Sequence, residues 1–325
     1  MSVIYHYFFI CLLLVILELS YFRLAIKTNI VDKPNHRSSH KRITIRGGGI
    51  VFPIAIFLQA LFSGFEYPLF SLGLFFISAI SFYDDLRPLS NKIRILVHLI
   101  AVSLLFAQAD LLTYTIWIII PAYILVIGTI NAYNFMDGIN GITGAYSLIT
   151  LLSLYFINES GIQFVSNELL IITVLALLIF NYFNFRKKAK CFAGDVGSVS
   201  MAYIILFFLL LLILKSGDLK YIGLLLFYGL DAVSTIFFRL IRKENIFEAH
   251  RSHFYQYLAN VKGWHHLWIS TLYMIVQLMV NLLIFYSEWD SVDFLIFILV
   301  SGIVFVGLRF VIEGRRHLMG RELAN

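Results

Sequence analysis

The sequence predicts an all-α, polytopic membrane protein: a bundle of about eleven transmembrane helices, with ten as the alternative count. Of its 325 residues, 60% are hydrophobic and only 14% are charged, a composition that a soluble protein of this length could not accommodate. Apolar stretches able to cross a hydrocarbon core of about 30 Å recur along the whole chain. When these stretches alternate in direction, 23 of the 25 Lys and Arg residues fall on one side of the membrane.

The positions of the apolar stretches define the predicted spans. They are 3–22, 49–65, 69–83, 95–109, 112–131, 142–157, 167–184, 199–214, 220–238, 266–287 and 292–309. The first stretch lacks the basic flank and small-residue cleavage site of a signal peptide, so we interpret it as a retained helix. Cys11 and Cys191 imply no disulfide framework. Because no repeat or low-complexity segment divides the chain, we expect a single domain over residues 1–325.

The distribution of basic residues sets the expected orientation. The outer loops hold only Lys215 and Lys220. Since Lys and Arg are retained on the cytoplasmic side, we expect the N-terminus outside and the C-terminus in the cytoplasm of a multi-pass cell-membrane protein, the inner membrane where there are two. The net charge of +6 is accounted for by this topology, by membrane lipids with anionic headgroups and by a polyanionic substrate, so it requires no nucleic acid.

Two polar segments open the cytoplasmic side. Residues 32–49 combine basic residues, which could bind phosphate, with a run of three glycines, which permit close backbone approach to a ligand. The alternative is a basic cytoplasmic loop with a glycine hinge. Further on, Asp84 and Asp85 follow an apolar stretch and precede three basic residues. Adjacent carboxylates repel unless a cation neutralises them. This pair therefore suits a Mg²⁺ site or a proton-accepting base, or else exposed acids paired with the nearby basic residues.

The segment 131–144 ends one predicted helix and begins another. It carries Asn131, Asn134, Asp137 and Asn140 with three glycines and no basic residue. Steps of three place these side chains on roughly one helical face. Polar groups at membrane depth are costly and usually face a cavity, so we expect them to contact a base or sugar; a turn with Asx caps is the alternative.

The segment 191–200 places Asp195 between Gly194 and Gly197 at the start of a helix. A lone carboxylate among glycines suits Mg²⁺, which takes one or two protein oxygens and leaves positions for phosphate. The alternative is that Asp195 merely caps the helix. Phe192 is expected to stack on an aromatic ring or to pack.

A cationic segment near residue 250 completes the set. His250, Arg251 and His253 form a phosphate cradle more readily than a metal site, because no further Cys or His stands at zinc spacing. A solvated basic loop is the alternative. Asp231, an acid inside a predicted span, is either functional or a partner of Arg239.

Together these groups favour phosphate-ester chemistry at the inner surface, and five motifs carry a resemblance to a known family. The chain resembles the polyprenyl-phosphate N-acetylhexosamine-1-phosphate transferases, relatives of phospho-MurNAc-pentapeptide translocase. Its motifs at 32–49 and 249–253 most resemble those of the branch that initiates O-antigen or teichoic-type polymers. The motifs, in family order, are DKPNHRSSHKRITIRGGG, FYDDLRPLS, NAYNFMDGING, FAGDVGS and AHRSH.

The resemblance implies transfer of sugar-1-phosphate from a UDP-N-acetylhexosamine to undecaprenyl phosphate, with release of UMP. It implies that Asp84 and Asp85 are the catalytic acids and that Asp195 binds Mg²⁺, for which Mn²⁺ is a candidate substitute. Residues that would bind substrate are Arg46, Lys92 and Arg94 at the lipid phosphate, Asn131, Asn134, Asp137, Asn140 and Phe192 at the nucleotide, and His250, Arg251 and His253 at the diphosphate.

Two departures from the family pattern are visible. Position 88 is Pro88 where the family often has a third acid, and Asn140 replaces the second Asp of DGxDG. Asn140 keeps an acceptor oxygen but cannot serve as a base. The sequence leaves open which UDP-sugar is used, which polymer is initiated, whether the protein is a homodimer, and whether Asp84 forms a covalent phospho-enzyme. The rival hypotheses are a flippase for lipid-linked sugars and a CDP-alcohol phosphotransferase, whose extended motif is absent.

Overall fold

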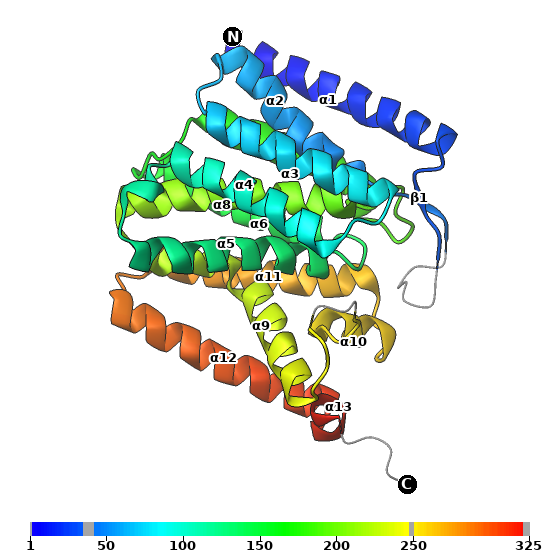
Figure 1. The fold of residues 1–325 in the computed structure, drawn as a ribbon, viewed down its shortest axis with the longest axis vertical. Helices are drawn as coiled ribbons and strands as arrows, with labels where there is room; N and C mark the ends of the chain where they lie inside the picture. The colour runs from blue at the N-terminus through cyan, green and yellow to red at the C-terminus, as the bar shows by residue number, and fades with distance from the viewer. Residues whose placement is uncertain (1, 35–41, 247–249, 321–325) are drawn as a thin grey trace.

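The computed structural model describes residues 2–34, 42–246 and 250–320, which form a bundle of long helices (Figure 1). Parts of two predicted motifs, residues 35–41 and Ala249, lie outside this range. The elements are α1 Ser2–Lys27, β1 Val31–Asp32, β2 Thr44–Ile45, η1 Gly48–Ile50, α2 Val51–Ser63, α3 Pro68–Leu86, α4 Asn91–Gln108, η2 Leu111–Thr113, α5 Ile116–Met136, α6 Ile142–Glu159, α7 Asn167–Asn184, α8 Gly194–Ser216, η3 Leu219–Leu225, α9 Leu226–Ile241, α10 Phe254–Asn260, α11 His266–Tyr286, α12 Ser291–Glu313 and α13 Arg315–Met319.

Each of the eleven predicted spans coincides with helical structure, although one helix is short and the span 220–238 begins as a 3₁₀ segment. In the described residues, nine spans are long and apolar enough to cross a membrane by themselves. The other two predicted spans are α2, which has 13 residues, and α6, which packs between α7 and α11. Successive helices run back and forth, so α1 begins at one end of the bundle and α12 finishes at the other (Figure 1). This confirms the membrane-bundle fold.

Helix α8 forms the centre of the bundle. Of its most apolar 18-residue window, 83% is buried, against 11% for α12 and 17% for α5. It packs against α3, α5, α6 and α2. Because α5 and α12 expose most of their apolar side chains, these two helices face lipid. Helix α8 is enclosed by protein, so its N-terminal turn is held in a fixed position.

The span 219–241 is interrupted, and neighbouring helices satisfy the interrupted backbone. Its first part is the 3₁₀ segment η3, after which α9 runs at a steep angle to its neighbours (Figure 1). Gln277 of α11 accepts a hydrogen bond from the amide of Phe227 (2.9 Å) and donates one to the carbonyl of Gly223 (2.9 Å). The Tyr146 hydroxyl accepts from the amide of Tyr228 (3.3 Å). Irregular backbone is tolerated at membrane depth only with such partners.

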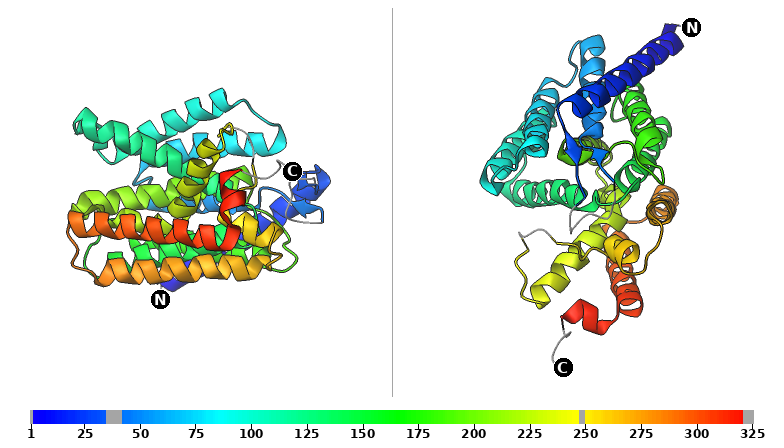
Figure 2. Two further views of the ribbon diagram at one scale, coloured as in Figure 1. Left: turned by 90° about the horizontal axis from the view of Figure 1, so that it is seen from below. Right: turned by 90° about the vertical axis from the view of Figure 1, so that its right-hand side faces the viewer.

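A small antiparallel sheet lies at the end of the bundle that also carries α10 and α13. Strands β1 and β2 pair in the register Val31 with Ile45, and Ile45 also bridges to Cys191 in parallel. Figure 2 looks onto this end in its right-hand view, with the strands in front of the helices. The all-α expectation did not include this sheet, because two-residue strands leave no periodic pattern. It joins the first polar segment to the start of α8.

Candidate functional site

Asp85 links three segments that are far apart in the sequence. Its carboxylate accepts the backbone amides of Asp195 and Val196, both at 3.0 Å, and Arg46 Nε at 2.6 Å. The residue at the N-cap of α8 is Ala193, whose side chain cannot accept a hydrogen bond. An acid from α3 therefore performs the capping that the chain does not supply locally, and its negative charge is favourable at a helix N-terminus.

The other acids of the cluster face arginines. Arg94 Nη1 lies 3.1 Å from Asp84 Oδ2, and the two oxygens of Asp195 lie 3.7 Å from Arg46 and 3.9 Å from Arg94. Asp84 also accepts the amide of Leu89 (2.6 Å), which terminates α3. Pairing of Asp84 and Asp85 with basic residues, one of the interpretations of the sequence, is therefore observed. Asp195 is in the first turn of α8 and is not its N-cap, so the mere-cap interpretation is wrong.

Asn134 connects α5 to this cluster. Oriented with its oxygen accepting from Arg94 Nη2 (3.0 Å), its amide nitrogen donates to Asp195 Oδ1 and to Ser198 Oγ, both at 3.2 Å. Ser198 stands one turn after Asp195 and had not been predicted to take part. Since both amide faces are used, Asn134 fixes the relative positions of a cation and an anion from two other helices.

Glycines in the first polar segment and at the start of α8 allow the two to lie in direct backbone contact. The amides of Gly48 and Gly49 donate to the carbonyls of Phe192 and Ala193 at 2.8 and 3.0 Å. A Cβ on Gly49 would be 2.3 Å from the Cα of Gly197. Gly194 has a φ of +71°, and a Cβ there would meet Asp85 Oδ2 at 2.6 Å. The glycines are therefore required by close backbone approach, and this places Arg46 beside Asp85.

Asp137 lies just after α5, close to the acid cluster. Burial raises its pKa to about 7, and the negative charge of Asp85 acts in the same direction. The carboxyl is therefore partly protonated near neutral pH. Its usual pKa of 3.8 applies in the unfolded chain.

The raised pKa of Asp137 predicts that the substrate-free protein loses stability as the pH rises from about 4 to about 7, because the folded state binds the proton more tightly than the unfolded state. One pKa unit corresponds to about 1.4 kcal/mol, so the loss is a few kcal/mol at most. We expect the melting temperature in detergent with EDTA to fall less over this range for Asp137→Asn than for the wild type. Parallel curves for the two proteins would contradict the assignment.

A large basic cavity opens beside the cluster. Its volume is about 910 Å³, and it lies between the β1–β2 region and the segment 186–192. Asn140 and Phe192, for which nucleotide contacts are predicted, both line it, and Asn140 donates to the carbonyl of Arg186 (2.9 Å). Its basic lining consists of Lys33 and Arg42 from the first polar segment and of Lys187, Lys188 and Lys190, which the sequence had linked only to topology.

The predicted histidine motif packs against the end of α5. The ring centroid of Phe135 lies 5.9 Å from that of His250 and 6.3 Å from that of His253. Burial lowers the pKa of His250 to about 4, with His253 and Arg239 acting in the same direction, so His250 is neutral at pH 7. His253 is 1% exposed, and its Nδ1 lies 3.4 Å from Asp231 Oδ1.

Asp231 belongs to the histidine segment. The alternative that it pairs with Arg239 is wrong, because Arg239 Nε lies 3.0 Å from Glu244. Asp231 instead accepts the amide of Phe254 (2.9 Å) and lies 3.4 Å from His253 Nδ1.

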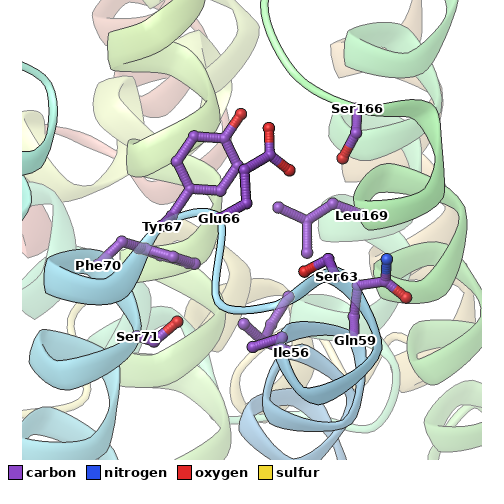
Figure 3. Close-up of a pocket in the computed structure, with 10 residues that line it drawn as sticks. Ile56, Gln59, Ser63, Glu66, Tyr67, Phe70, Ser71, Ser166 and Leu169 are labelled. Atoms are coloured by element: carbon purple, nitrogen blue, oxygen red, sulfur yellow. The ribbon is translucent and has the colours of Figure 1, made fainter.

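Two predicted substrate-binding residues stand apart from the cluster. Asn131 donates to the carbonyl of Ile127 within its own helix (2.8 Å), and Lys92 is exposed on the first turn of α4. At the opposite end of the bundle, Figure 3 shows a pocket between α2, α3 and α7 lined by Gln59, Tyr67 and Leu169. Its volume of about 10 Å³ is that of one water, too small for a sugar nucleotide.

Comparisons with known proteins identify the relatives of this chain. A family model described as Glycosyl transferase family 4 matches residues 67–213. A Thermotoga maritima undecaprenyl-phosphate alpha-N-acetylglucosaminyl 1-phosphate transferase is 30% identical over 80% of this chain and 82% of its own length. A probable enzyme of that kind from Bacillus subtilis is 29% identical over 78% and 76%. A Thermotoga petrophila phospho-N-acetylmuramoyl-pentapeptide-transferase is 30% identical over 56% and 71%. The chain belongs to the polyprenyl-phosphate N-acetylhexosamine-1-phosphate transferase family.

Proposed function

We propose that this protein transfers N-acetylhexosamine-1-phosphate from a UDP-sugar to undecaprenyl phosphate, releasing UMP and starting a lipid-linked cell-surface glycan of the O-antigen or teichoic type. The observation that carries the proposal is the cluster of Asp84, Asp85 and Asp195 with Arg46 and Arg94, at one end of a membrane bundle and beside a basic cavity. Relatives named as undecaprenyl-phosphate N-acetylglucosaminyl 1-phosphate transferases support N-acetylglucosamine as the first sugar to test.

In the proposed reaction an oxygen of the lipid phosphate attacks the β-phosphorus of the donor in line, and UMP leaves. Two anions must approach each other, so the protein contributes mainly position and positive charge. The Phe192 ring and the Asn140 amide in the 910 Å³ cavity would hold the uridine, with the surrounding lysines near the diphosphate. Arg46 and Arg94 lie where the reacting phosphates would meet the acids.

The donor set fits Mg²⁺ held largely by substrate. Asp84 and Asp195 both face Arg94, at 3.1 and 3.9 Å, and two carboxylates this close to one cation repel unless further positive charge is bound. In the described part of the chain no three acidic, His or Cys side chains could hold a metal alone, but Mg²⁺ needs only one or two carboxylates beside phosphate and water. Asp195, with Asp84, would hold the ion, which would neutralise charge on the diphosphate when bound.

A direct transfer is favoured over a phospho-enzyme on Asp84. One oxygen of Asp84 accepts the Leu89 amide and the other faces Arg94, and these contacts lower the nucleophilicity of the carboxylate. Trapping a labelled covalent intermediate on Asp84 would support the alternative, whereas single-turnover transfer with no such species supports the direct reaction. Arg94, which faces Asp84 and Asp195, would position the lipid phosphate.

We assign this end of the bundle to the cytoplasmic side. Apart from Lys215 and Lys220, the described basic residues stand near the ends of α1 and α3, at the start of α4, in the segment before α8, and near or after the ends of α9 and α12, all at the end that carries the site. That bias supports an active site facing the cytoplasm.

The decisive test is an assay of purified protein with undecaprenyl phosphate, Mg²⁺ and a panel of UDP-sugars, following UMP release and the lipid product. We expect UMP release with one or more UDP-N-acetylhexosamines, dependent on both the lipid phosphate and the divalent ion. No release with any donor of the panel would overturn the proposal, and release without lipid would point to hydrolysis.

A further inference from the structure

A buried ion pair in the last long helix has no role in the reaction described so far. Arg309 and Glu313 of α12 have side chains only 1% exposed and stand one turn apart, with Arg309 Nε bonded to Glu313 Oε1. Charged groups in a membrane span are costly, and a buried pair adds little to stability compared with apolar residues of similar size. Such a pair is therefore a candidate for a specific task.

The guanidinium of Arg309 is directed at the histidine segment. Its Nη2 donates to the carbonyl of Ser252 at 3.0 Å, immediately before His253. Its Nη1 donates to Ser234 Oγ and to Thr235 Oγ1 of α9, both at 2.9 Å. One guanidinium thus joins α12, α9 and the segment that precedes α10. The Glu313 carboxylate fixes the orientation of this guanidinium by accepting hydrogen bonds from it.

Thr235 extends this network to Asp231. The Thr235 hydroxyl donates to Asp231 Oδ1 at 3.2 Å. Asp231 is fully buried and accepts the amides of Phe254 (2.9 Å) and Tyr255 (3.3 Å), as well as the Tyr273 hydroxyl (2.7 Å). The carboxylate therefore holds the first turn of α10.

The segment held in this way reaches the polar end of α5. The Tyr255 hydroxyl donates to the carbonyl of Phe135 at 2.8 Å, and a Cβ on Gly138 would be 2.2 Å from that hydroxyl oxygen. His253 lies 3.4 Å from Asp231 on one side and contacts the Phe135 ring on the other. A displacement at Ser252 would therefore be transmitted to the immediate neighbours of Asp137.

We propose that Arg309 is a positioning residue, which acts through Ser252 and through Thr235 and Asp231 to hold the segment of His253 and Tyr255 against the polar end of α5, beside the proposed site of the sugar-nucleotide donor. The identity of the donor in this inference rests on the proposed function, whereas the contacts of Arg309 do not depend on it. Arg309 touches no reacting group itself. It lies about a hundred residues beyond the matched family region 67–213, in a helix that otherwise faces lipid.

The first test removes both charges together, so that no unpaired charge is left in the bundle. The Arg309→Met/Glu313→Leu double variant is expected to fold, because apolar residues of similar volume can replace a buried pair without loss of stability. Hydrogen exchange at the amides of Phe254 and Tyr255 should become about tenfold faster, and kcat/KM for UDP-N-acetylglucosamine should fall about tenfold, within the coupling range of contacting residues. The KM for undecaprenyl phosphate should not change.

A cycle with His253→Ala separates positioning from general stability. If Arg309 acts through His253, the double variant should cost almost nothing further in kcat/KM once His253 is absent. A merely structural pair would reduce activity by the same factor in both backgrounds, and that result would overturn the proposal.

Two matched single variants give an answer even if the double variant fails to fold. Thr235→Val and Ser234→Ala each remove one hydroxyl that Arg309 contacts, but only the Thr235 hydroxyl bonds the Asp231 carboxylate. We expect faster exchange at Phe254 and Tyr255, and weaker donor use, for Thr235→Val alone. Equal effects, or none, would overturn the positioning role. If the wild type released no UMP, the proposed function would fail, while the exchange data would still decide the role of Arg309.

Discussion

Asp195→Asn is expected to reduce sugar-phosphate transfer by more than about 100-fold, because substitution of residues that only support a metal ligand already costs about 10–100-fold. Asn preserves the shape of the side chain and one acceptor oxygen. It removes the charge that faces Arg46 and Arg94 at 3.7 and 3.9 Å and that would bind Mg²⁺. The measurement is the initial rate of UMP release at saturating UDP-sugar and Mg²⁺.

Asn140→Asp is the matched control for this prediction. It also exchanges an amide and a carboxylate, but at a residue that lines the 910 Å³ cavity, and it restores the acid usual in the family. We expect it to keep activity. If Asp195→Asn ran at the wild-type rate in Mg²⁺, the assignment of Asp195 to the metal would be wrong, whatever the behaviour of Asn140→Asp.

Gly49→Ala is expected to disrupt both the site and the stability of the protein. The added methyl would lie 2.3 Å from the Cα of Gly197 and 3.0 Å from the carbonyl oxygen of Ala193, both main-chain atoms that no side-chain rotation can move. Overpacking of this kind typically costs about 1–3 kcal/mol. Separation of the glycine run from α8 would also withdraw Arg46 from Asp85. The measurements are the melting temperature in detergent and the rate of transfer.

Two further alanine variants frame the result for Gly49. Gly197→Ala approaches the same contact from the other side, with its Cβ 2.7 Å from the Cα of Gly49, and should behave similarly. Gly128→Ala in α5 meets no atom within 4 Å and should leave both properties unchanged. A Gly49→Ala protein with normal activity and melting temperature would show that the glycine run does not lie on α8 as described.

The fold was largely predictable because each long helix is a continuous apolar stretch, and hydropathy alone locates such stretches. The helix ends were less predictable. Predicted spans ended at residues 83 and 131 and one began at 199, whereas the helices continue through Asp84, Asp85 and Asn134 and begin before Asp195. Polar residues at these ends lower the mean hydropathy, but they remain helical because their side chains find partners in neighbouring helices.

The candidate site was predictable as a set of residue types but not as a set of contacts. Sequence reasoning grouped Asp84, Asp85 and Asp195, yet nothing in the order of residues indicates that Asp85 bonds the amides at the start of α8 or that Arg94 faces Asp84. Arg46 was predicted to bind lipid phosphate, and the sequence did not indicate that it also bonds Asp85. Such pairings depend on how helices cross. Lys187, Lys188 and Lys190 were visible as a basic cluster, but their place in a cavity with Phe192 required the fold.

The bond from Asp85 to the amides of residues 195 and 196 has a consequence for biosynthesis. The acid and its amide partners are separated by 110 residues of chain. Because a protein is synthesised from its N-terminus onward, several helices must be made after α3 before α8 is available. Until the eighth helix joins its neighbours, Asp85 lacks the two backbone amides that offset its charge. The nascent enzyme therefore acquires its catalytic pocket late, and a product truncated before residue 194 would enter the bilayer without one.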